Sequence, residues 1–314
     1  MAMAFPRTVR AVVLLSVALS LAGTARAADY LRIATYNIEN YLDAPAGTRP
    51  SKSAEARAKV RECLRALQAG VVALQEVGGS NSLAELRASL KSEGLDYPFW
   101  EMITGHDTNI HVAVLSQFPM TARRPHTNDS FLLYGRRFHV NRGFAEMDIQ
   151  VNPNFSFTLI TAHLKSRLPS AEADEAELRE QEALLLREKI DHDFKEHPGL
   201  NLVVLGDFND TKDSLAIRSL MGRGRTALID TRPAERNGDE SLKIKESRYA
   251  PRTVNWTYFY GKADTYSRID YILISQAMAS RWVPEETWAL NMPNWGVASD
   301  HRPIVAGFRM EETK

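Results

Sequence analysis

The sequence contains only one cysteine, Cys63, among its 314 residues. A single thiol excludes an intrachain disulfide and any zinc or iron site built from several cysteines. The chain also has no repeat, no low-complexity segment and no basic surplus, because 39 Lys and Arg balance 39 Asp and Glu. Dedicated nucleic-acid-binding domains usually carry a basic surplus, so the composition gives no support to one, although it is compatible with a local basic groove.

Long apolar runs are missing except near the amino terminus. Residues 1–27 combine two early arginines with an apolar core over residues 11–22 and the small-x-small sequence Ala25-Arg26-Ala27. This order is typical of a signal peptide, and the core is shorter than the roughly 20 residues of a membrane span. We therefore expect cleavage after Ala27, export to the periplasm or the medium, and no stable membrane span afterwards; an uncleaved anchor is the less favoured alternative. Cleavage leaves 36 basic and 39 acidic residues, a mildly acidic chain.

Short apolar runs rich in β-branched residues alternate with helical patterns through the rest of the chain. The runs near residues 31, 71, 111, 157 and 202 predict strands that are covered on both faces. Between them, helix formers fill residues 51–69, 82–91 and 171–197. Residues 130–163 carry strand patterns without a helix, and residues 253–275 predict a hairpin that turns at 261–264. The sequence thus predicts one α/β domain over residues 28–314, with two packed mixed sheets and helices outside.

Polar side chains stand where these apolar runs end or begin. Antiparallel neighbours place the start of one strand beside the end of the next, so these side chains can meet at one mouth of the sandwich. Each of them alone is compatible with a turn or a cap, but carboxylates beside apolar strands are costly unless paired or bound to a cation. Oxygen ligands with a few imidazoles suit Mg²⁺, Mn²⁺ or Ca²⁺. The set comprises Asn37, Glu76, His163, Asp207, Asn209, Asp270, Asp300 and His301.

Two other metal motifs do not fit. The stretch DFNDTKD begins like a calcium-binding loop, but Lys212 stands where the turn glycine belongs and Arg218 where the bidentate glutamate belongs. The chain also has no H-E-x-x-H zinc motif. His192 and His197, at the end of the longest predicted helix, are expected to cap it or to face solvent.

Six short motifs occur in order along the chain: TYNIEN, ALQEV, TAHLKS, VVLGDFND, SRIDYIL and SDHRPIV. Over about residues 31–309 they resemble the signature set of the endonuclease/exonuclease/phosphatase superfamily. This superfamily includes secreted deoxyribonucleases, abasic-site nucleases, sphingomyelinases and inositol polyphosphate phosphatases. The resemblance implies a four-layer α/β sandwich and metal-assisted cleavage of a phosphate ester.

The resemblance also implies roles for individual side chains. Glu76 resembles the principal metal ligand, with Asn37 and Asp300 close to the same cation, for which Mg²⁺ is the first expectation. Asp207 resembles the group that orients or deprotonates the attacking water, and Asn209 the amide that fixes the phosphate or that water. The number of metal ions stays open.

The imidazole motifs imply the groups that face the scissile phosphate. His301 resembles the imidazole at that phosphate, held by Asp270, and either His301 or Asp207 can be the general base. His163, in TAHL, resembles the secreted deoxyribonuclease and sphingomyelinase branches, where it would stabilise the transition state or protonate the leaving group. Arg142 resembles a substrate-binding side chain of the family.

Three functions are compatible with these motifs. The leading hypothesis is an exported, monomeric nuclease that hydrolyses DNA or RNA. The alternatives are a phosphoesterase for phospholipid head groups or small organic phosphates, and a catalytically dead binding module, which the complete set of motif residues disfavours. Lys165 and Arg167 can contact phosphate or simply face solvent, and a local phosphate groove is expected from Arg136, Arg137, Arg142, Arg268 and Arg302.

Two segments bear on the substrate without deciding it. Residues 222–252 are polar and turn-rich, which predicts one long surface loop with substrate contacts. The hairpin sequence WTYFYGK is short, which argues mildly against a lipid substrate. Its alternation predicts that Trp256 and Tyr258 lie in the core, while aromatics there, or Trp295, are alternatively placed to stack on a base.

Overall fold

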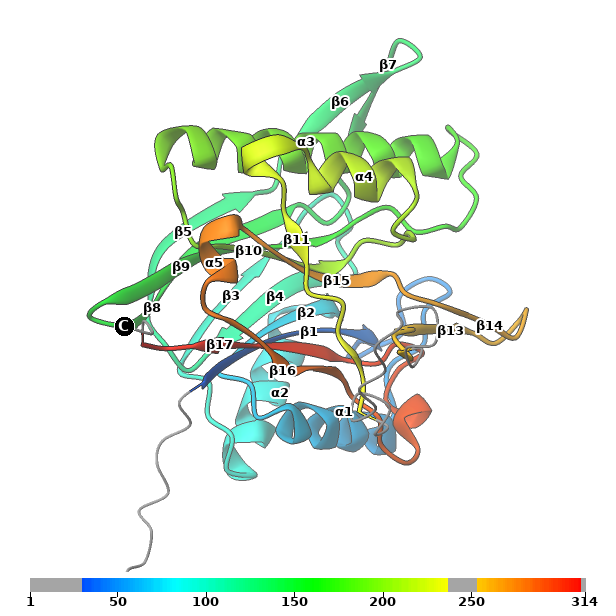
Figure 1. Ribbon diagram of the computed structural model, residues 1–314. Coiled ribbons are helices and arrows are strands. Elements are labelled where there is room, and N and C mark those ends of the chain that lie inside the picture. Colours follow the sequence, from blue (N-terminus) through cyan, green and yellow to red (C-terminus); the bar gives the residue numbers. More distant parts are fainter. Residues whose placement is uncertain (1–29, 237–252, 312–314) are drawn as a thin grey trace, which may run out of the picture.

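Two large β-sheets pack face to face, and helices cover their outer faces (Figure 1). The computed structural model describes residues 30–236 and 253–311. The predicted signal peptide and residues 237–252 of the predicted surface loop therefore lie outside the described residues. The four layers confirm the α/β sandwich that the sequence predicts.

The first sheet has seven strands, and its central pair, β1 and β2, is parallel. The parallel pair fits the helix between the two strands, because a parallel connection needs a crossover. In spatial order the strands are β12 (Ala234–Glu235), β16 (Trp282–Ala289), β17 (Ile304–Arg309), β1 (Tyr30–Tyr41), β2 (Val71–Val77), β4 (His111–Ser116) and β3 (Phe99–Ile103).

The second sheet has six strands, with β9 and β10 as its parallel pair. In spatial order they are β11 (Ile229–Asp230), β15 (Asp270–Ile274), β10 (Leu202–Asp207), β9 (Phe155–His163), β8 (Phe144–Asn152) and β5 (Met120–His126). Two small hairpins stand outside the sheets: β6 (Ser130–Leu133) with β7 (Arg136–His139), and β13 (Tyr258–Tyr260) with β14 (Thr265–Ser267). The second hairpin confirms the predicted turn at residues 261–264.

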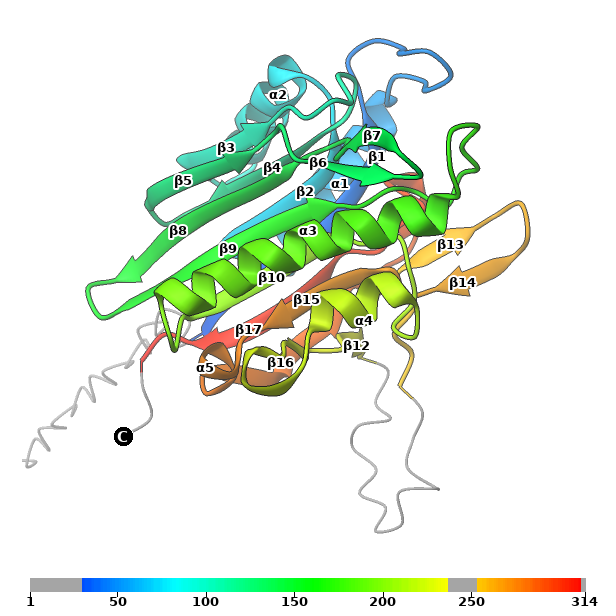
Figure 2. The same ribbon diagram turned by 90° about the horizontal axis from the view of Figure 1, so that it is seen from above.

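The helices divide between the two outer faces (Figures 1 and 2). Helices α1 (Ala54–Leu67) and α2 (Ser80–Ser92) cover the first sheet, while α3 (Glu175–Glu196) and α4 (Leu215–Met221) cover the second. Shorter pieces are α5 (Gln276–Ala279) and the 3₁₀ turns η1 (Gly224–Thr226) and η4 (Trp295–Val297). Each predicted helix is present, although α3 begins four residues later than the pattern suggests, at the cap Asp174.

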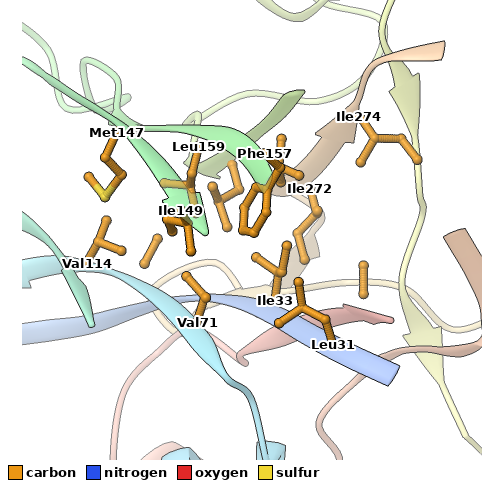
Figure 3. Close-up of a cluster of buried hydrophobic side chains, with 14 of the residues drawn as sticks. Leu31, Ile33, Val71, Val114, Met147, Ile149, Phe157, Leu159, Ile272 and Ile274 are labelled. Atoms are coloured by element: carbon orange, nitrogen blue, oxygen red, sulfur yellow. The ribbon is translucent and has the colours of Figure 1, made fainter. Parts of the chain in front are cut away.

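The main core lies between the sheets, where apolar side chains from both inner faces meet. In Figure 3, Ile33 and Val71 of the first sheet face Ile149, Phe157 and Leu159 of the second. Burying a side chain of this size contributes about 1.5–3 kcal/mol, so this layer alone stabilises the sandwich considerably. A further apolar layer lies between the first sheet and its helices, and another lies between the second sheet and its helices.

One expectation about the segment after α4 is wrong. Residues 222–236 are not simply a surface loop, because β11 extends the edge of the second sheet and β12 extends the edge of the first. Two-residue strands have too little length to show an alternating pattern, so sequence periodicity does not reveal them. Only residues 237–252 of the predicted loop are left outside the described structure.

Candidate active site

Three neighbouring strands of the second sheet bring polar residues to one row. Asp207, at the end of β10, is paired in register with His163 of β9 on one side and with Asp270 of β15 on the other. The His163 Nε2 atom lies 3.4 Å from the Asp207 Oδ2 atom. All three side chains are buried. The parallel β9–β10 pair and the antiparallel β10–β15 pair thus produce the convergence that the strand-end pattern predicts.

Gly206 explains why the apolar run of β10 stops so abruptly. Its φ is +142°, and a Cβ atom there would lie 1.9 Å from the carbonyl oxygen of Ala162. Only glycine allows this backbone conformation and this approach of β10 to β9. The glycine therefore sets the spacing at which Asp207 and His163 face each other.

Backbone irregularities in the first sheet aim Asn37 and Glu76 at the same place. The β1–β2 register shifts after Asn37, and Glu76 adopts a positive φ of 63°, which is uncommon for a non-glycine residue. The Asn37 Nδ2 atom donates to Asp207 Oδ2 at 2.9 Å and to Glu76 Oε1 at 3.3 Å. The other Glu76 oxygen accepts from the backbone N–H of Asn40 at 2.9 Å. Asn37 therefore links the carboxylates of the two sheets.

His301 is held between carboxylates. Its Nδ1 atom lies 2.8 Å from Asp270 Oδ2, while its Nε2 atom lies 3.7 Å from Asp207 Oδ2 and 3.9 Å from Asp300 Oδ1. Ser299 fixes the loop, because its hydroxyl donates to the Asn37 carbonyl at 2.8 Å and accepts from the His301 N–H at 3.0 Å. The geometry agrees with the expected pairing of His301 and Asp270.

The guanidinium of Arg142 borders the site on the side opposite His301. Arg142 is only 6% exposed, and its Nη1 atom donates to the Leu164 carbonyl at 3.3 Å. Its Nε atom lies 3.8 Å from the Asp107 carboxylate but has no hydrogen-bond partner among the described residues, and neither has His163 Nδ1. Buried polar atoms without hydrogen-bond partners are rare and call for an explanation, and a bound substrate group is the natural one for the Arg142 donor. A phosphate oxygen has the charge and the acceptors to match Arg142.

The remaining predicted residues line this side in different ways. Asn209 has a positive φ of 55° and its Nδ2 atom also donates to the Leu164 carbonyl, at 3.0 Å. Lys165 Nζ donates to the carbonyls of Ser166 and Leu168, each at 3.0 Å. Arg167 donates to the Asn209 carbonyl at 2.9 Å. The structure thus brings Lys165 and Arg167 to the edge of the site, where their side chains are bound to the protein backbone.

Burial and neighbouring charges shift the pKa values of His163 and His301 in opposite directions. Burial opposes the charged form of His301, but the charges of Asp270 and Asp207 raise the pKa of His301 well above its ordinary value. Burial and the nearby charges of Arg142 and His301 lower the pKa of His163 well below its ordinary value. The surroundings therefore favour the charged form of His301 and the neutral form of His163, so the two imidazoles can perform different tasks.

The carboxylates are crowded in a way that fits a cation. Burial, together with the charge of Asp270, raises the pKa of Asp207 to about 7, although His301 acts in the opposite direction. Burial and the charge of Glu76 raise the pKa of Asp300. A divalent cation beside such carboxylates would favour their ionised forms and supply the missing positive charge. The carboxylate oxygens of Glu76 and Asp300 are hard donors, as Mg²⁺ and Mn²⁺ require, so they are suited to hold such an ion. Asn37 instead turns its NH₂ group to the carboxylates, and its Oδ1 atom accepts from the Glu39 N–H at 3.0 Å.

Another cluster in the described residues also satisfies metal-ligand distances. One ligand atom from each of Asp207, Asp270 and His301 lies within 4.8 Å of the others. In this trio the His301 Nδ1 atom is already engaged by Asp270. We therefore interpret the trio as an imidazolium between two carboxylates, adjacent to the oxygen-rich position at Glu76 and Asp300.

Two of the five arginines expected in a phosphate groove, Arg268 and Arg302, are instead held inside the protein. Arg302 is 1% exposed, lies 3.5 Å from the centre of the Trp256 ring and binds Glu235 at 2.8 Å. Arg268 is also buried, and its guanidinium pairs with Asp230 at 2.6 Å. Sequence proximity to a motif does not decide which way an alternating side chain points.

The expected burial of Trp256 and Tyr258 is likewise wrong. Thr257 is the buried residue of this stretch, and its hydroxyl accepts from the N–H groups of Ile269 and Asp270. Trp256 and Tyr258 are half-buried instead, and the Tyr258 ring lies 4.8 Å from the His301 ring. The register of the hairpin places its aromatic face beside the active site.

An aromatic pocket of about 430 Å³ adjoins Asp300. Tyr258, Tyr260 and Trp295 line it together with the carboxylates of Glu39 and Asp300. The β13–β14 hairpin is fixed to the catalytic loop, because the Phe259 N–H donates to the Asp300 carbonyl at 3.0 Å. The aromatic side chains therefore have a defined position relative to the metal-binding side of the site.

Sequence reasoning missed a polar layer beneath the site. Thr35, Gln75 and Thr161 are fully buried, and Gln75 Nε2 donates to Thr35 at 3.0 Å and to Thr161 at 3.4 Å. The bond to Thr161 joins the two sheets directly below the carboxylates. A glutamine within the apolar run VVALQEV was the available signal.

The fold and the site together define a two-sheet α/β phosphoester hydrolase. The model of the Endonuclease/Exonuclease/phosphatase family matches residues 34–301, and the chain belongs to this family. Members of the family are phosphoester hydrolases that usually use divalent metals. No curated protein sequence matches the chain.

Solved structures share the fold at low sequence identity. The catalytic domain of human Nocturnin with a bound sulfate anion has a TM-score of 0.60 at 15% identity, covering 89% of this chain and 94% of that one. The 3′ phosphatase NExo from Neisseria, bound to a product DNA hairpin, has a TM-score of 0.57 at 17% identity, covering 88% and 99%. Sphingomyelinase C from Streptomyces griseocarneus has a TM-score of 0.54 at 19% identity, covering 89% and 99%. At these identities the likeness shows the fold alone.

Among the helices of the described residues, none is long and apolar enough to span a membrane.

Proposed function

We propose that this protein is an exported, metal-dependent phosphodiesterase, and that its substrate is a nucleic acid. The observation that carries the proposal is the single site in which Asp207 meets His163, Asp270, His301 and Asn37. The inventory matches what phosphodiester hydrolysis needs: a group to accept a proton and donors for the developing charge.

The chain's own residues have distinct tasks in this proposal. Asp207 orients the attacking water and is positioned to take its proton, and Asn37 holds the Asp207 carboxylate by the 2.9 Å hydrogen bond. His301, kept cationic by Asp270, donates to a phosphate oxygen, while Arg142 binds another from the opposite side. A divalent cation held by Glu76 and Asp300, with Asn37 close by, would offset the negative charge that builds up on the phosphate.

His163 and Asn209 complete the proposed site. His163 is neutral and buried, so it is suited to stabilise the transition state or to hand a proton to the leaving oxygen. Asn209 shares the Leu164 carbonyl with Arg142 and is proposed to fix the phosphate or the water. Lys165 and Arg167 support the substrate-binding edge.

The aromatic pocket supports a nucleic-acid substrate. Bases stack on aromatic side chains, and each stacked base contributes about 1–3 kcal/mol. Tyr258, Tyr260 and Trp295 provide such faces within reach of a group attached to the scissile phosphate. For localisation, the predicted signal peptide supports a periplasmic or secreted protein. The monomeric state is part of the proposal without further support.

The same pocket supports one alternative substrate. Aromatic rings beside the carboxylates of Glu39 and Asp300 are also suited to a quaternary ammonium group, through cation–π and ionic attraction. A phospholipid with such a head group is therefore the second candidate, before small organic phosphates.

A substrate panel tests the proposal. The mature protein, with Mg²⁺ or Mn²⁺, would be incubated with supercoiled plasmid, single-stranded RNA, sphingomyelin vesicles and p-nitrophenyl phosphate. We expect metal-dependent cleavage of nucleic acid that disappears with EDTA and in the Asp207→Ala variant. Cleavage of sphingomyelin or the monoester alone would contradict the assignment of nucleic acid as the substrate. The roles assigned to the catalytic residues would then still apply.

A further inference from the structure

A second pocket lies on the other flank of the site. The β6–β7 hairpin stands alongside α3 in both views (Figures 1 and 2), and the Tyr134 hydroxyl fixes it there by donating to Glu177 at 2.6 Å. Between this hairpin, the loop after β9 and α3 is a pocket of about 320 Å³. We call it the arginine pocket; its basic and imidazole side chains are those of Arg136, Arg137, Lys165, His106 and His139.

The wall of the arginine pocket is continuous with the active site. Glu182 of α3, 2% exposed, accepts from the backbone N–H of Lys165 at 2.6 Å and from that of Asn141 at 3.4 Å. Asn141 directly precedes Arg142, and Lys165 directly follows the Leu164 carbonyl that Arg142 binds. Asn141 and Lys165, which line the pocket, are therefore chain neighbours of Arg142 and of the residue whose carbonyl Arg142 binds.

Two acidic residues also line the pocket, and neither cancels its basic character. The Glu182 carboxylate is engaged by the two backbone N–H groups. The Glu172 side chain is 64% exposed and lies 3.7 Å from Arg136, so this is a surface ion pair that a phosphate can displace. The Arg137 guanidinium donates to the Ser130 hydroxyl at 2.8 Å, a neutral acceptor.

The two pockets flank the catalytic residues. The aromatic pocket is lined by Asp300, whereas the arginine pocket is lined by Asn141, the chain neighbour of Arg142. A compact ester with one phosphate would occupy only the catalytic site between the two pockets. A chain with several phosphates would span the whole mouth.

We infer that the arginine pocket is a second phosphate subsite, which binds a neighbouring phosphate of the same polynucleotide strand. The inference rests on the proposed nuclease function and deepens it, because it assigns an extended strand as the substrate. Arg136 and Arg137 supply charged donors, and the His106 and His139 rings, 3.9 Å apart, form the side of the pocket. Arginine suits this task because its planar fork matches phosphate oxygens.

The test compares a strand with a substrate that has only one phosphate. The double variant Arg136→Gln/Arg137→Gln and the wild-type mature protein would be assayed on a twelve-nucleotide single strand and on a dinucleotide with one phosphodiester. The matched control is Arg223→Gln/Arg225→Gln, which removes two exposed arginines beyond α4. Each assay would be repeated over a range of salt concentrations.

We expect kcat/KM of the double variant to fall at least about tenfold on the twelve-nucleotide strand and to stay unchanged on the dinucleotide. The dependence of log KM on log salt should flatten by about 0.7 for each phosphate contact that is lost. The control variant should behave as the wild type. An equal loss on both substrates, or no loss on the strand, overturns the inference.

Two further outcomes separate this inference from the function on which it rests. If the wild type cleaves neither nucleic-acid substrate with metal present, the proposed nuclease function fails and the subsite fails with it. If the double variant instead loses binding to vesicles of anionic lipid while it cleaves the strand normally, the pocket serves a membrane surface and the inference is overturned. If the wild type is active and the double variant behaves like the control variant, only the proposed subsite is refuted.

Discussion

Replacing Asp270 by asparagine removes the charge that keeps His301 cationic without changing the size of the side chain. The Asp270 carboxylate lies 2.8 Å from His301 Nδ1, and both side chains are buried. The charge of Asp270 helps to raise the pKa of His301, so the variant lowers that pKa and moves the loss of imidazolium to lower pH. We expect the alkaline limb of the pH–rate profile to move in the same direction.

The distance sets the size of the effect. Two unit charges 2.8 Å apart attract by about 6 kcal/mol at an effective dielectric constant of about 20, before the cost of desolvation. A positioned imidazole that acts as an acid or a base typically contributes about 10²- to 10⁴-fold to a rate. We therefore expect kcat to fall by about 10²- to 10⁴-fold. Asp207, 3.7 Å from His301 Nε2, still supports the imidazolium and favours the lower end of this range.

The assay is steady-state hydrolysis of plasmid or oligonucleotide from pH 5 to pH 10, with circular dichroism to confirm folding. The matched control is Asp148→Asn, which removes a carboxylate from a charged network with Arg124 on the outer face of the second sheet. That variant should keep near-normal turnover. A folded Asp270→Asn protein with unchanged kcat and an unchanged alkaline limb would refute the proposed role of the pair.

Four other predictions follow from the structure. Glu76→Ala should lower kcat/KM about 10³-fold or more, and EDTA should do the same to the wild type, because both remove the cation; full activity in EDTA would contradict the metal assignment. Asp207→Asn should be inactive yet more stable: the folded pKa of about 7 exceeds the unfolded value of about 3.9, so ionisation destabilises the wild type as pH rises between them. Chemical denaturation should show a gain at pH 8 of at most about 4 kcal/mol, the equivalent of a shift of about three pKa units, that vanishes near pH 4. Gly206→Ala should lose at least about 3 kcal/mol, because its Cβ meets the Ala162 carbonyl, and an unchanged melting temperature would oppose this. Mass spectrometry of the exported protein should find Ala28 at its amino terminus, not Met1.

Much of the fold can be predicted because the apolar periodicity is strong. The runs ending at Asn37, Glu76, His163 and Asp207 are strands, as their length and β-branched content indicate. The polar ends of the second sheet do converge, since the pairings of β10 with β9 and β15 place His163, Asp207 and Asp270 in one row. The apolar pattern alone does not predict the order of the strands or the helices that cover each sheet. These features are predicted by the family resemblance.

The errors arise where orientation depends on tertiary packing. Alternation alone placed Trp256 and Tyr258 in the core, but Thr257 is buried there because its hydroxyl binds the start of β15. Arg302 was expected to face phosphate, yet stacking on Trp256 and pairing with Glu235 fix it inside the protein. Sequence spacing does not specify such partners, which come from segments tens of residues away.

A crystal structure of the mature protein with Mn²⁺ and an uncleavable phosphorothioate oligonucleotide tests the central claim most directly. The account predicts an anomalous manganese peak at the Glu76 carboxylate with Asp300 and Asn37 close by, and a phosphate between His301 and Arg142. The strand should run from the aromatic pocket to the arginine pocket. A manganese peak away from Glu76, or a phosphate that contacts none of these side chains, would contradict it.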